Sequence, residues 1–208
     1  MSEGLKHDGE ATSLARHVLC AVPQLADPNF VRSVVLMIDH DERGAFGLVL
    51  NNTLPTRVAE VASSLGLTWE GAPEQEIHLG GPVEPIRGFV LHDQPTWDPL
   101  AEEVMEGVWL TMTLDGVSER GSFGGAGSFR FVLGYAGWGA GQLEAEMASG
   151  SWIAVPIGSA AGPGEGLDAP WIFRADPESM WNEALSALGV DPARFVGHHG
   201  IGSPIAKA

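Results

Sequence analysis

Several polar side chains lie beside glycine-rich turns at the ends of apolar segments, where acid–base chemistry or ligand binding would need them. His40 and His92 each end an apolar run, and Glu144 and Glu146 follow the glycine-dense segment 134–141. A histidine titrates near neutral pH, so an imidazole paired with one of these carboxylates could exchange protons with a substrate. One hypothesis is therefore a small-molecule enzyme that uses histidine and carboxylate chemistry.

The other candidates are suited to binding. Arg32 opens an apolar run, Asn51 closes the next one, and Trp138 and Gln142 belong to the glycine-rich corner. Gln142 and Glu146 are four residues apart and should share one helix face. Polar groups beside such turns commonly form clefts, because a rigid scaffold holds the loops in place. Each of these groups could instead satisfy local backbone atoms.

The first hypothesis is that these residues bind a ligand or a partner and catalyse no reaction. The protein is interpreted as a non-enzymatic binding or regulatory module that recognises a protein partner or a small ligand. Its recess is expected to be shared by Arg32, Trp138 and Gln142, and no residue is assigned a catalytic role, because no nucleophile–base pair is recognisable.

Common cofactor motifs are missing from the sequence. There is no phosphate-binding loop, and the turn after Tyr135 has Gln142 where a dinucleotide-binding fingerprint requires its third glycine. No two of the seven histidines have the i, i+4 spacing of zinc ligands on a predicted helix. The segment from Asp39 begins like a calcium loop but has Leu50 at the position of the bidentate glutamate. We therefore predict no cofactor and no metal, and expect Cys20 to be an inert core thiol.

Composition and charge narrow the classes further. The 208 residues are 44% hydrophobic and 18% charged, which is typical of a globular protein, and the single cysteine allows no internal disulfide. The N-terminus does not resemble a signal peptide, and no apolar run approaches the roughly 20 residues that cross a bilayer, so a cytoplasmic location without membrane contact is expected. The net charge of −16 and the scattered basic residues disfavour direct nucleic acid binding.

The hydrophobic pattern predicts a chain rich in strands. Strands are expected at residues 17–22, 33–39, 45–51, 77–79, 86–92, 108–114, 129–135 and 152–157. Helices are expected at residues 58–65 and 142–148 and in a final segment with Asp176 as N-cap and Trp181, Leu185 and Leu188 facing inward. The hairpin of 33–39 and 45–51 is almost continuously apolar and should be covered on both faces.

The remaining segments are expected to be irregular. Residues 98–106 are interpreted as an acidic turn and residues 116–128 as a mobile loop rich in glycine and serine. Strands outnumber helices and do not alternate with them, which predicts the α+β class. We expect a single domain over residues 1–208, with flexible tails at 1–14 and 198–208.

A series of motifs in the same order resembles the YqgE/AlgH family of bacterial proteins. It runs from Leu25-x-Asp27-x-x-Phe-x-Arg32 through His40-(x)3-Gly44 and Arg87-Gly-Phe-Val-Leu-His92 to Leu133-Gly-Tyr-Ala-Gly-Trp-x-x-Gly-Gln-Leu-Glu144. The resemblance spans roughly residues 14–190. It differs in Asn51-Asn-Thr53, where the family usually has Asn-Arg-Pro, and in the glycine-rich segment 116–128, which replaces a helix.

The resemblance implies a split, strongly bent and mostly antiparallel sheet that forms a pseudo-barrel flanked by helices. Members of the family are largely uncharacterised, and some are described as transcriptional regulators. The sequence has no helix-turn-helix pattern and its charge has the wrong sign for DNA. A regulator that binds DNA is therefore the third and least favoured hypothesis.

Overall fold

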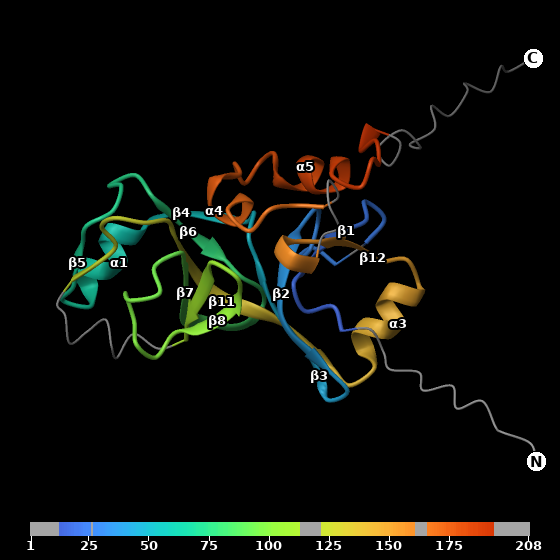
Figure 1. The fold of residues 1–208 in the computed structure, drawn as a ribbon, viewed down its shortest axis with the longest axis horizontal. Helices are drawn as coiled ribbons and strands as arrows, with labels where there is room; N and C mark the ends of the chain where they lie inside the picture. Colours follow the sequence, from blue (N-terminus) through green and yellow to red (C-terminus); the bar gives the residue numbers. More distant parts are fainter. Residues whose placement is uncertain (1–12, 26, 113–121, 161–165, 194–208) are drawn as a thin grey trace, which may run out of the picture.

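The computed structural model describes residues 13–25, 27–112, 122–160 and 166–193 (Figure 1). Its strands are β1 (His17–Ala21), β2 (Val34–Asp41), β3 (Gly44–Val49), β4 (Thr53–Arg57), β5 (Thr68–Trp69), β6 (Glu76–Leu79), β7 (Val83–His92), β8 (Glu102–Met105), β9 (Val108–Thr111), β10 (Ser122–Phe123), β11 (Phe129–Gly139) and β12 (Trp152–Pro156). Its helices are α1 (Val58–Ser64), α3 (Gln142–Ala148), α4 (Trp171–Arg174) and α5 (Met180–Ser186), with one 3-10 turn at Gly158–Ala160.

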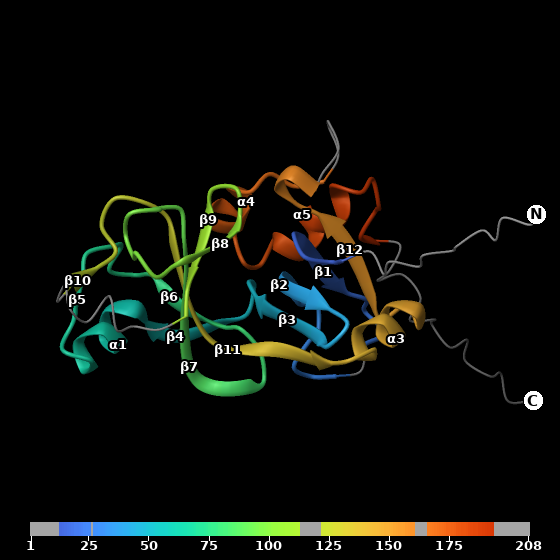
Figure 2. The ribbon, with the colours of Figure 1, turned by 60° about the horizontal axis from the view of Figure 1, so that its bottom comes forward.

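Ten of these strands form one bent sheet organised around β11. The order is β12-β1-β2-β3-β11-β7-β9-β8, and β6 pairs with both β11 and β4. The C-terminal part of β11 pairs with β3, whereas its N-terminal part pairs with β7 and β6. Among the described strands of this sheet, β6 and β11 form the one parallel pairing. Because β11 runs through both halves of the molecule (Figure 2), the structure confirms the α+β class and the split, bent sheet.

The two halves meet where Gly80 and Gly81 lie against β11. A Cβ atom on Gly81 would be 2.3 Å from the backbone of Tyr135. Gly134 has a φ of +70°, and the β7–β11 register shifts between Leu133 and Tyr135. Such an irregularity increases local twist, and glycine permits both the close approach and the positive φ. The bend of the sheet is therefore fixed at this crossing.

Both faces of the sheet are buried in the half that contains the hairpin β2–β3. Val18 and Cys20 of β1 belong to a core that includes residues of α4 and α5, and Leu19 and Ala21 face the opposite core beneath α3. Figure 1 shows α4 and α5 on the same side of the sheet. The prediction of a hairpin covered on both faces is confirmed. A third core lies between α1 and the other half of the sheet, with Phe131 among its members.

The final helix starts later than predicted. Asp176 opens the turn that leads into α5, since its Oδ1 accepts from Glu178 N at 3.0 Å and its carbonyl accepts from Ser179 N at 2.9 Å and Met180 N at 3.0 Å, but α5 begins only at Met180. Trp181 and Leu185 are buried as expected, and Trp181 Nε1 donates to the carbonyl of Ala21, 160 residues away, at 2.8 Å.

The prediction that the side chain of Leu188 faces inward was wrong. Its side chain is 38% exposed, because α5 ends at Ser186 and Leu188 lies in the turn that leads to Gly189.

Two segments that were predicted to be irregular contain short strands. The acidic segment 98–106 contains β8, and the glycine-rich segment contains β10, which pairs with β5; residues 116–121 of that predicted loop lie outside the described residues. The tails at 1–12 and 198–208 also lie outside them, whereas Ser13 Oγ donates to the carbonyl of His40. None of the helices in the described ranges has the length and hydropathy needed to cross a membrane.

Candidate functional site

Arg32 and Asn51 join the start of β2 to the end of β3. Asn51 Oδ1 accepts from Val34 N at 2.8 Å, and Asn51 Nδ2 donates to the carbonyl of Arg32 at 2.9 Å. The guanidinium of Arg32 lies 4.7 Å from the centre of the Trp181 ring and donates to Asn182 Oδ1 at 3.4 Å. These two predicted residues therefore hold local backbone and connect it to α5.

Trp138 and Gln142 converge instead on Glu146. Glu146 Oε2 accepts from Trp138 Nε1 at 2.9 Å and from Trp152 Nε1 at 2.8 Å, while Gln142 Nε2 donates to Glu146 Oε1 at 2.9 Å. We call Trp138, Gln142, Glu146 and Trp152 the Glu146 cluster. It confirms that Gln142 and Glu146 share a helix face. The contacts of Arg32 lie with α5, so they do not bring Arg32 into this cluster.

His40 and Glu144 form the predicted imidazole–carboxylate pair. His40 Nε2 lies 3.1 Å from Glu144 Oε1, and His40 Nδ1 accepts from Leu14 N at 2.9 Å. Since Nδ1 is an acceptor, Nε2 carries the proton and donates to Glu144. The pKa of Glu144 is lowered by its own backbone N–H and then by His40. Both ring nitrogens thus have a partner, and this pair ties residue 14 to the sheet.

His92 is fully buried and lies apart from both glutamates. Its Nε2 lies 3.2 Å from Thr111 Oγ1, which in turn donates to Asp98 Oδ2 at 2.7 Å. Burial lowers the pKa of His92, and its ring packs against Trp97 at a centroid distance of 4.7 Å. The His92–Thr111–Asp98 network satisfies His92 Nε2 and the Thr111 hydroxyl inside the protein, whereas His92 Nδ1 makes no hydrogen bond of ordinary geometry with the described residues.

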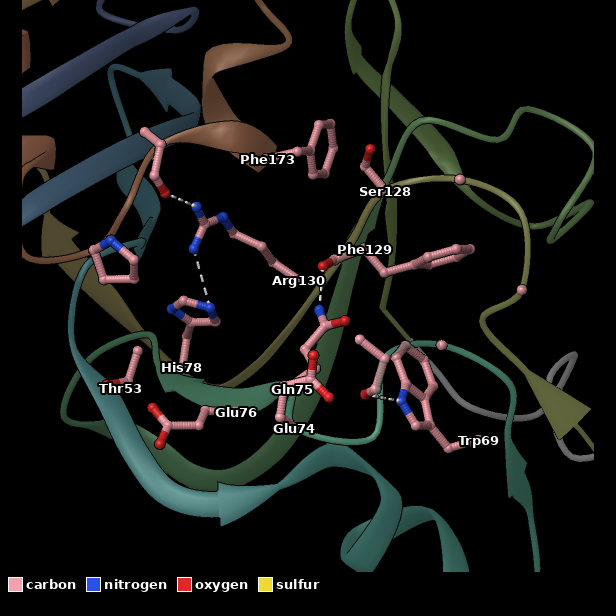
Figure 3. Close-up of a pocket in the computed structure, with 16 residues that line it drawn as sticks. Thr53, Trp69, Glu74, Gln75, Glu76, His78, Ser128, Phe129, Arg130 and Phe173 are labelled. Atoms are coloured by element: carbon pink, nitrogen blue, oxygen red, sulfur yellow. Dashed lines mark hydrogen bonds between the residues drawn. The ribbon is translucent and has the colours of Figure 1, made fainter.

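A cavity of about 530 Å³ lies between the β4–β6 edge, the start of β11 and the segment after α4 (Figure 3). We call it the Arg130 cleft. Its lining residues are Thr53, Trp69, Gly71, Ala72, Glu74, Gln75, Glu76, His78, Gly125, Gly127, Ser128, Phe129, Arg130, Phe173, Ala175 and Pro177. None of the residues proposed from sequence is among them.

Arg130 is the buried centre of this cleft. Phe129 and Phe131 face the core beneath α1, so strand alternation directs Arg130 to the opposite face, with Val132. Its side chain is held by carbonyls and a histidine. Nε donates to Ile172 O, Nη2 to Ala175 O at 2.7 Å, and Nη1 to Leu50 O at 3.5 Å and His78 Nε2 at 3.0 Å.

This arrangement leaves a buried cation without an opposite charge beside it. Burial lowers the pKa of Arg130 to about 10, partly opposed by Asp176, so the guanidinium is charged at neutral pH. Burial and the adjacent Arg130 lower the pKa of His78 to about 3, so the imidazole is neutral. Within the described part of the chain, no carboxylate lies within ion-pair distance of Arg130.

Two donor positions in the cleft remain unfilled. A guanidinium has five N–H groups, and the four hydrogen bonds of Arg130 leave one N–H of Nη2 without a partner among the described residues. His78 Nδ1 lies near the carbonyl of Leu50 but makes no hydrogen bond of ordinary geometry. Buried polar groups are nearly always satisfied, so the unfilled N–H of Arg130, a residue that lines the cavity, favours a ligand.

The outer part of the cleft is aromatic and acidic. Trp69 packs so closely on Gly71 that a Cβ there would lie 2.1 Å from the indole, and its Nε1 donates to Ala72 O at 2.8 Å. Glu74 and Glu76 are exposed along the same edge (Figure 3). Sequence reasoning missed this site. The available signal was a charged residue inside an apolar strand, Phe129-Arg-Phe-Val132.

Comparisons with known proteins agree over nearly the whole chain. The family model DUF179, described as AlgH-like, matches residues 18–193. A UPF0301 protein of Myxococcus xanthus is 42% identical over 191 residues, which cover 91% of this chain and 98% of the relative. A UPF0301 protein of Xanthomonas oryzae is 39% identical over 192 residues, with 91% and 96% covered.

Solved structures share the fold. The solution structure of the AlgH protein from Pseudomonas aeruginosa has a TM-score of 0.67 and 31% identity, covering 97% of this chain and all of that one. The crystal structure of DIP2367 from Corynebacterium diphtheriae has a TM-score of 0.62 at 21% identity, covering 86% and 90%, which shows the fold alone. The family model and these relatives establish that the chain belongs to the AlgH-like family of bacterial proteins.

Proposed function

We propose that this protein is a non-enzymatic binding module that takes up a small ligand through an anionic group at Arg130. The observation that carries the proposal is a buried, charged guanidinium that lines a cavity and has only neutral hydrogen-bond partners. Proteins normally pair a buried charge, because removing it from water is costly. A carboxylate or phosphate in the cleft would supply the missing counter-charge and accept from the unfilled N–H of Arg130.

The size and lining of the cleft support a ligand of metabolite size. A volume of about 530 Å³ lies within the usual range of ligand pockets, roughly 300–1,000 Å³. Trp69 and Phe173 provide apolar walls, and Arg130 provides a polar group that can fix orientation. This combination is typical of small-molecule sites.

The lining favours binding over catalysis. His78 could act as a base only through a free nitrogen, but its Nε2 accepts from Arg130 and its pKa is about 3. An imidazole with that pKa is a poor proton acceptor near pH 7. Among the lining residues no hydroxyl is hydrogen-bonded to a histidine, so the pairing that activates a serine or threonine nucleophile is not formed.

The proposal is tested by following backbone amide NMR signals while hexanoate or inorganic phosphate is added. In the wild-type protein at least one of these anions should shift the signals of Ser128 and Arg130 saturably. Arg130→Met should weaken the interaction at least about tenfold, because a charge-assisted hydrogen bond is lost. Arg32→Met is the matched control, since Arg32 is exposed and lies outside the cleft.

Two results would overturn the proposal. One is an equal response of the wild-type protein and Arg130→Met, and the other is no response of the cleft signals to either anion. Arg130→Lys provides a second reading if the methionine variant does not fold. It keeps the charge but loses the forked geometry, so it should bind more weakly than the wild-type protein.

A further inference from the structure

We infer that the ligand of the Arg130 cleft is a zwitterion, with a carboxylate at Arg130 and an ammonium group at Glu74 and Glu76. This inference rests on the proposed function and assigns the chemical class of its ligand. It follows from the presence of opposite charges at two depths of one cleft. Arg130 is 4% exposed, whereas Glu74 and Glu76 are exposed lining residues of the same cavity.

The two glutamates have no internal role that explains their position. Neither side chain has a hydrogen-bond or ion-pair partner within the ranges that the structure describes. In Figure 3 both carboxylates lie below His78 and Gln75, and the guanidinium of Arg130 lies above them. A ligand that enters past the glutamates would therefore meet negative charge first and positive charge deeper in the cleft.

This order of charges discriminates between anions. A phosphate carries up to two negative charges near neutral pH, and only one buried cation faces it, while two carboxylates and a net protein charge of −16 oppose it. A single carboxylate matches the single guanidinium, and a cationic group on the same molecule matches the glutamates. Gln75, the residue between the two glutamates, lines the same cleft, and its Nε2 donates to the carbonyl of Phe129.

The cleft also has room for a molecule with two separated charges. Its volume of about 530 Å³ greatly exceeds that of a simple carboxylate, and its aromatic walls can contact an aliphatic connection between the charged ends. Small amino acids and ω-amino carboxylates belong to this class.

The inference is tested by amide NMR titration with pairs of probes that differ only in the amine. 4-Aminobutanoate is compared with butanoate, and 6-aminohexanoate with hexanoate, so that two charge separations are covered. For at least one pair, the amino acid should bind roughly threefold to fivefold more tightly, as expected for a partly exposed ion pair. Inorganic phosphate should bind more weakly than the preferred amino acid.

A double variant then locates the amine. Glu74→Gln with Glu76→Gln should abolish the preference for the amino acid and leave binding of the simple carboxylate unchanged or stronger. The matched control is Glu102→Gln with Glu103→Gln, which changes the net charge equally on β8, outside the cleft. That control should keep the preference.

The outcomes separate this inference from the proposed function. If simple carboxylates bind as tightly as both amino acids, or if phosphate binds most tightly, the zwitterion is overturned and the anion-binding function stands. If the preference survives in the Glu74/Glu76 variant, the ammonium group does not lie at these glutamates and the inference is overturned. If none of the probes affects the cleft signals, the proposed function fails as well.

Discussion

The two ends of β11 hold buried or half-buried charges in opposite ways. Near its C-terminal end, Trp138 donates to Glu146, and this carboxylate also accepts from Trp152 and Gln142. Near its N-terminal end, Arg130 donates to carbonyls and to a neutral imidazole, and it faces a cavity. A charge whose partners converge on it stabilises packing. A charge that has only neutral partners and lies beside a cavity can still form an ion pair with a ligand.

The largest expected effect on stability concerns the C-terminal end of β11, where Glu146 accepts from three side chains. Glu146→Leu should remove the acceptor of two buried indole N–H groups, at a cost of roughly 1–3 kcal/mol for each unsatisfied donor. We expect a loss of about 4 kcal/mol in the free energy of unfolding, which corresponds to a fall of roughly 8–16 °C in Tm for a domain of this size. Denaturant unfolding and calorimetry measure both quantities.

The neighbouring glutamate is the control for this change. Glu144→Leu removes a partly exposed carboxylate with one side-chain partner, so its effect should be much smaller. Equal effects of the two substitutions would contradict the contrast between a matched charge and an ordinary surface pair.

The second prediction concerns the pH dependence of stability at the N-terminal end of β11, where His78 accepts from Arg130. In the folded protein the pKa of His78 is about 3, against an ordinary value of 6.5 when unfolded. Between these values the unfolded chain binds a proton that the folded chain does not, so stability falls as pH decreases from about 6.5 to about 3. The contribution lost between pH 7 and pH 4 is on the order of 3 kcal/mol.

His78→Phe isolates this contribution. The variant should lose less stability than the wild-type protein over the same pH interval, measured by urea unfolding at several pH values. His92, whose pKa is also lowered, remains in both proteins and cancels in the difference. Parallel pH profiles for the two proteins would show that burial beside Arg130 does not keep His78 neutral in the folded protein.

The smallest expected effect compares two arginines. Arg32 lies over Trp181 at the surface, where a cation–π contact is worth roughly 0.5–1 kcal/mol. Arg32→Met should therefore lower the free energy of unfolding by less than about 1 kcal/mol, as measured by urea denaturation. If Arg32→Met lowered the free energy of unfolding as much as Glu146→Leu, the exposed charge of Arg32 would contribute as much to stability as the half-buried charge of Glu146.

Sequence patterns predicted the elements whose signal is local. The apolar runs gave the principal strands, and the i, i+4 spacing placed Gln142 beside Glu146. The two-residue strands β5 and β10 were missed, because their pairing joins segments distant in sequence and leaves no local pattern. The proposed recess failed to unite Arg32 with Trp138 for the same reason, since the position of Arg32 depends on α5.

Sequence patterns could not predict the Arg130 cleft either. The sequence shows an arginine between two phenylalanines, but its acceptors come from β6, from the end of the β3 segment and from residues after Trp171. Whether such a residue meets a carboxylate or only carbonyls depends on long-range packing. The partners of Arg130 could therefore be identified only from the folded structure.

The position of β1 has a consequence for how the protein is made. This strand is synthesised before β12, which is one of its two neighbours, and the Trp181 indole that bonds to Ala21 is synthesised later still. The nascent chain must therefore carry an incompletely paired apolar strand until β12 and α5 have emerged. Because exposed strand edges promote aggregation, we expect the yield of native protein to depend on chaperones that shield the growing polypeptide.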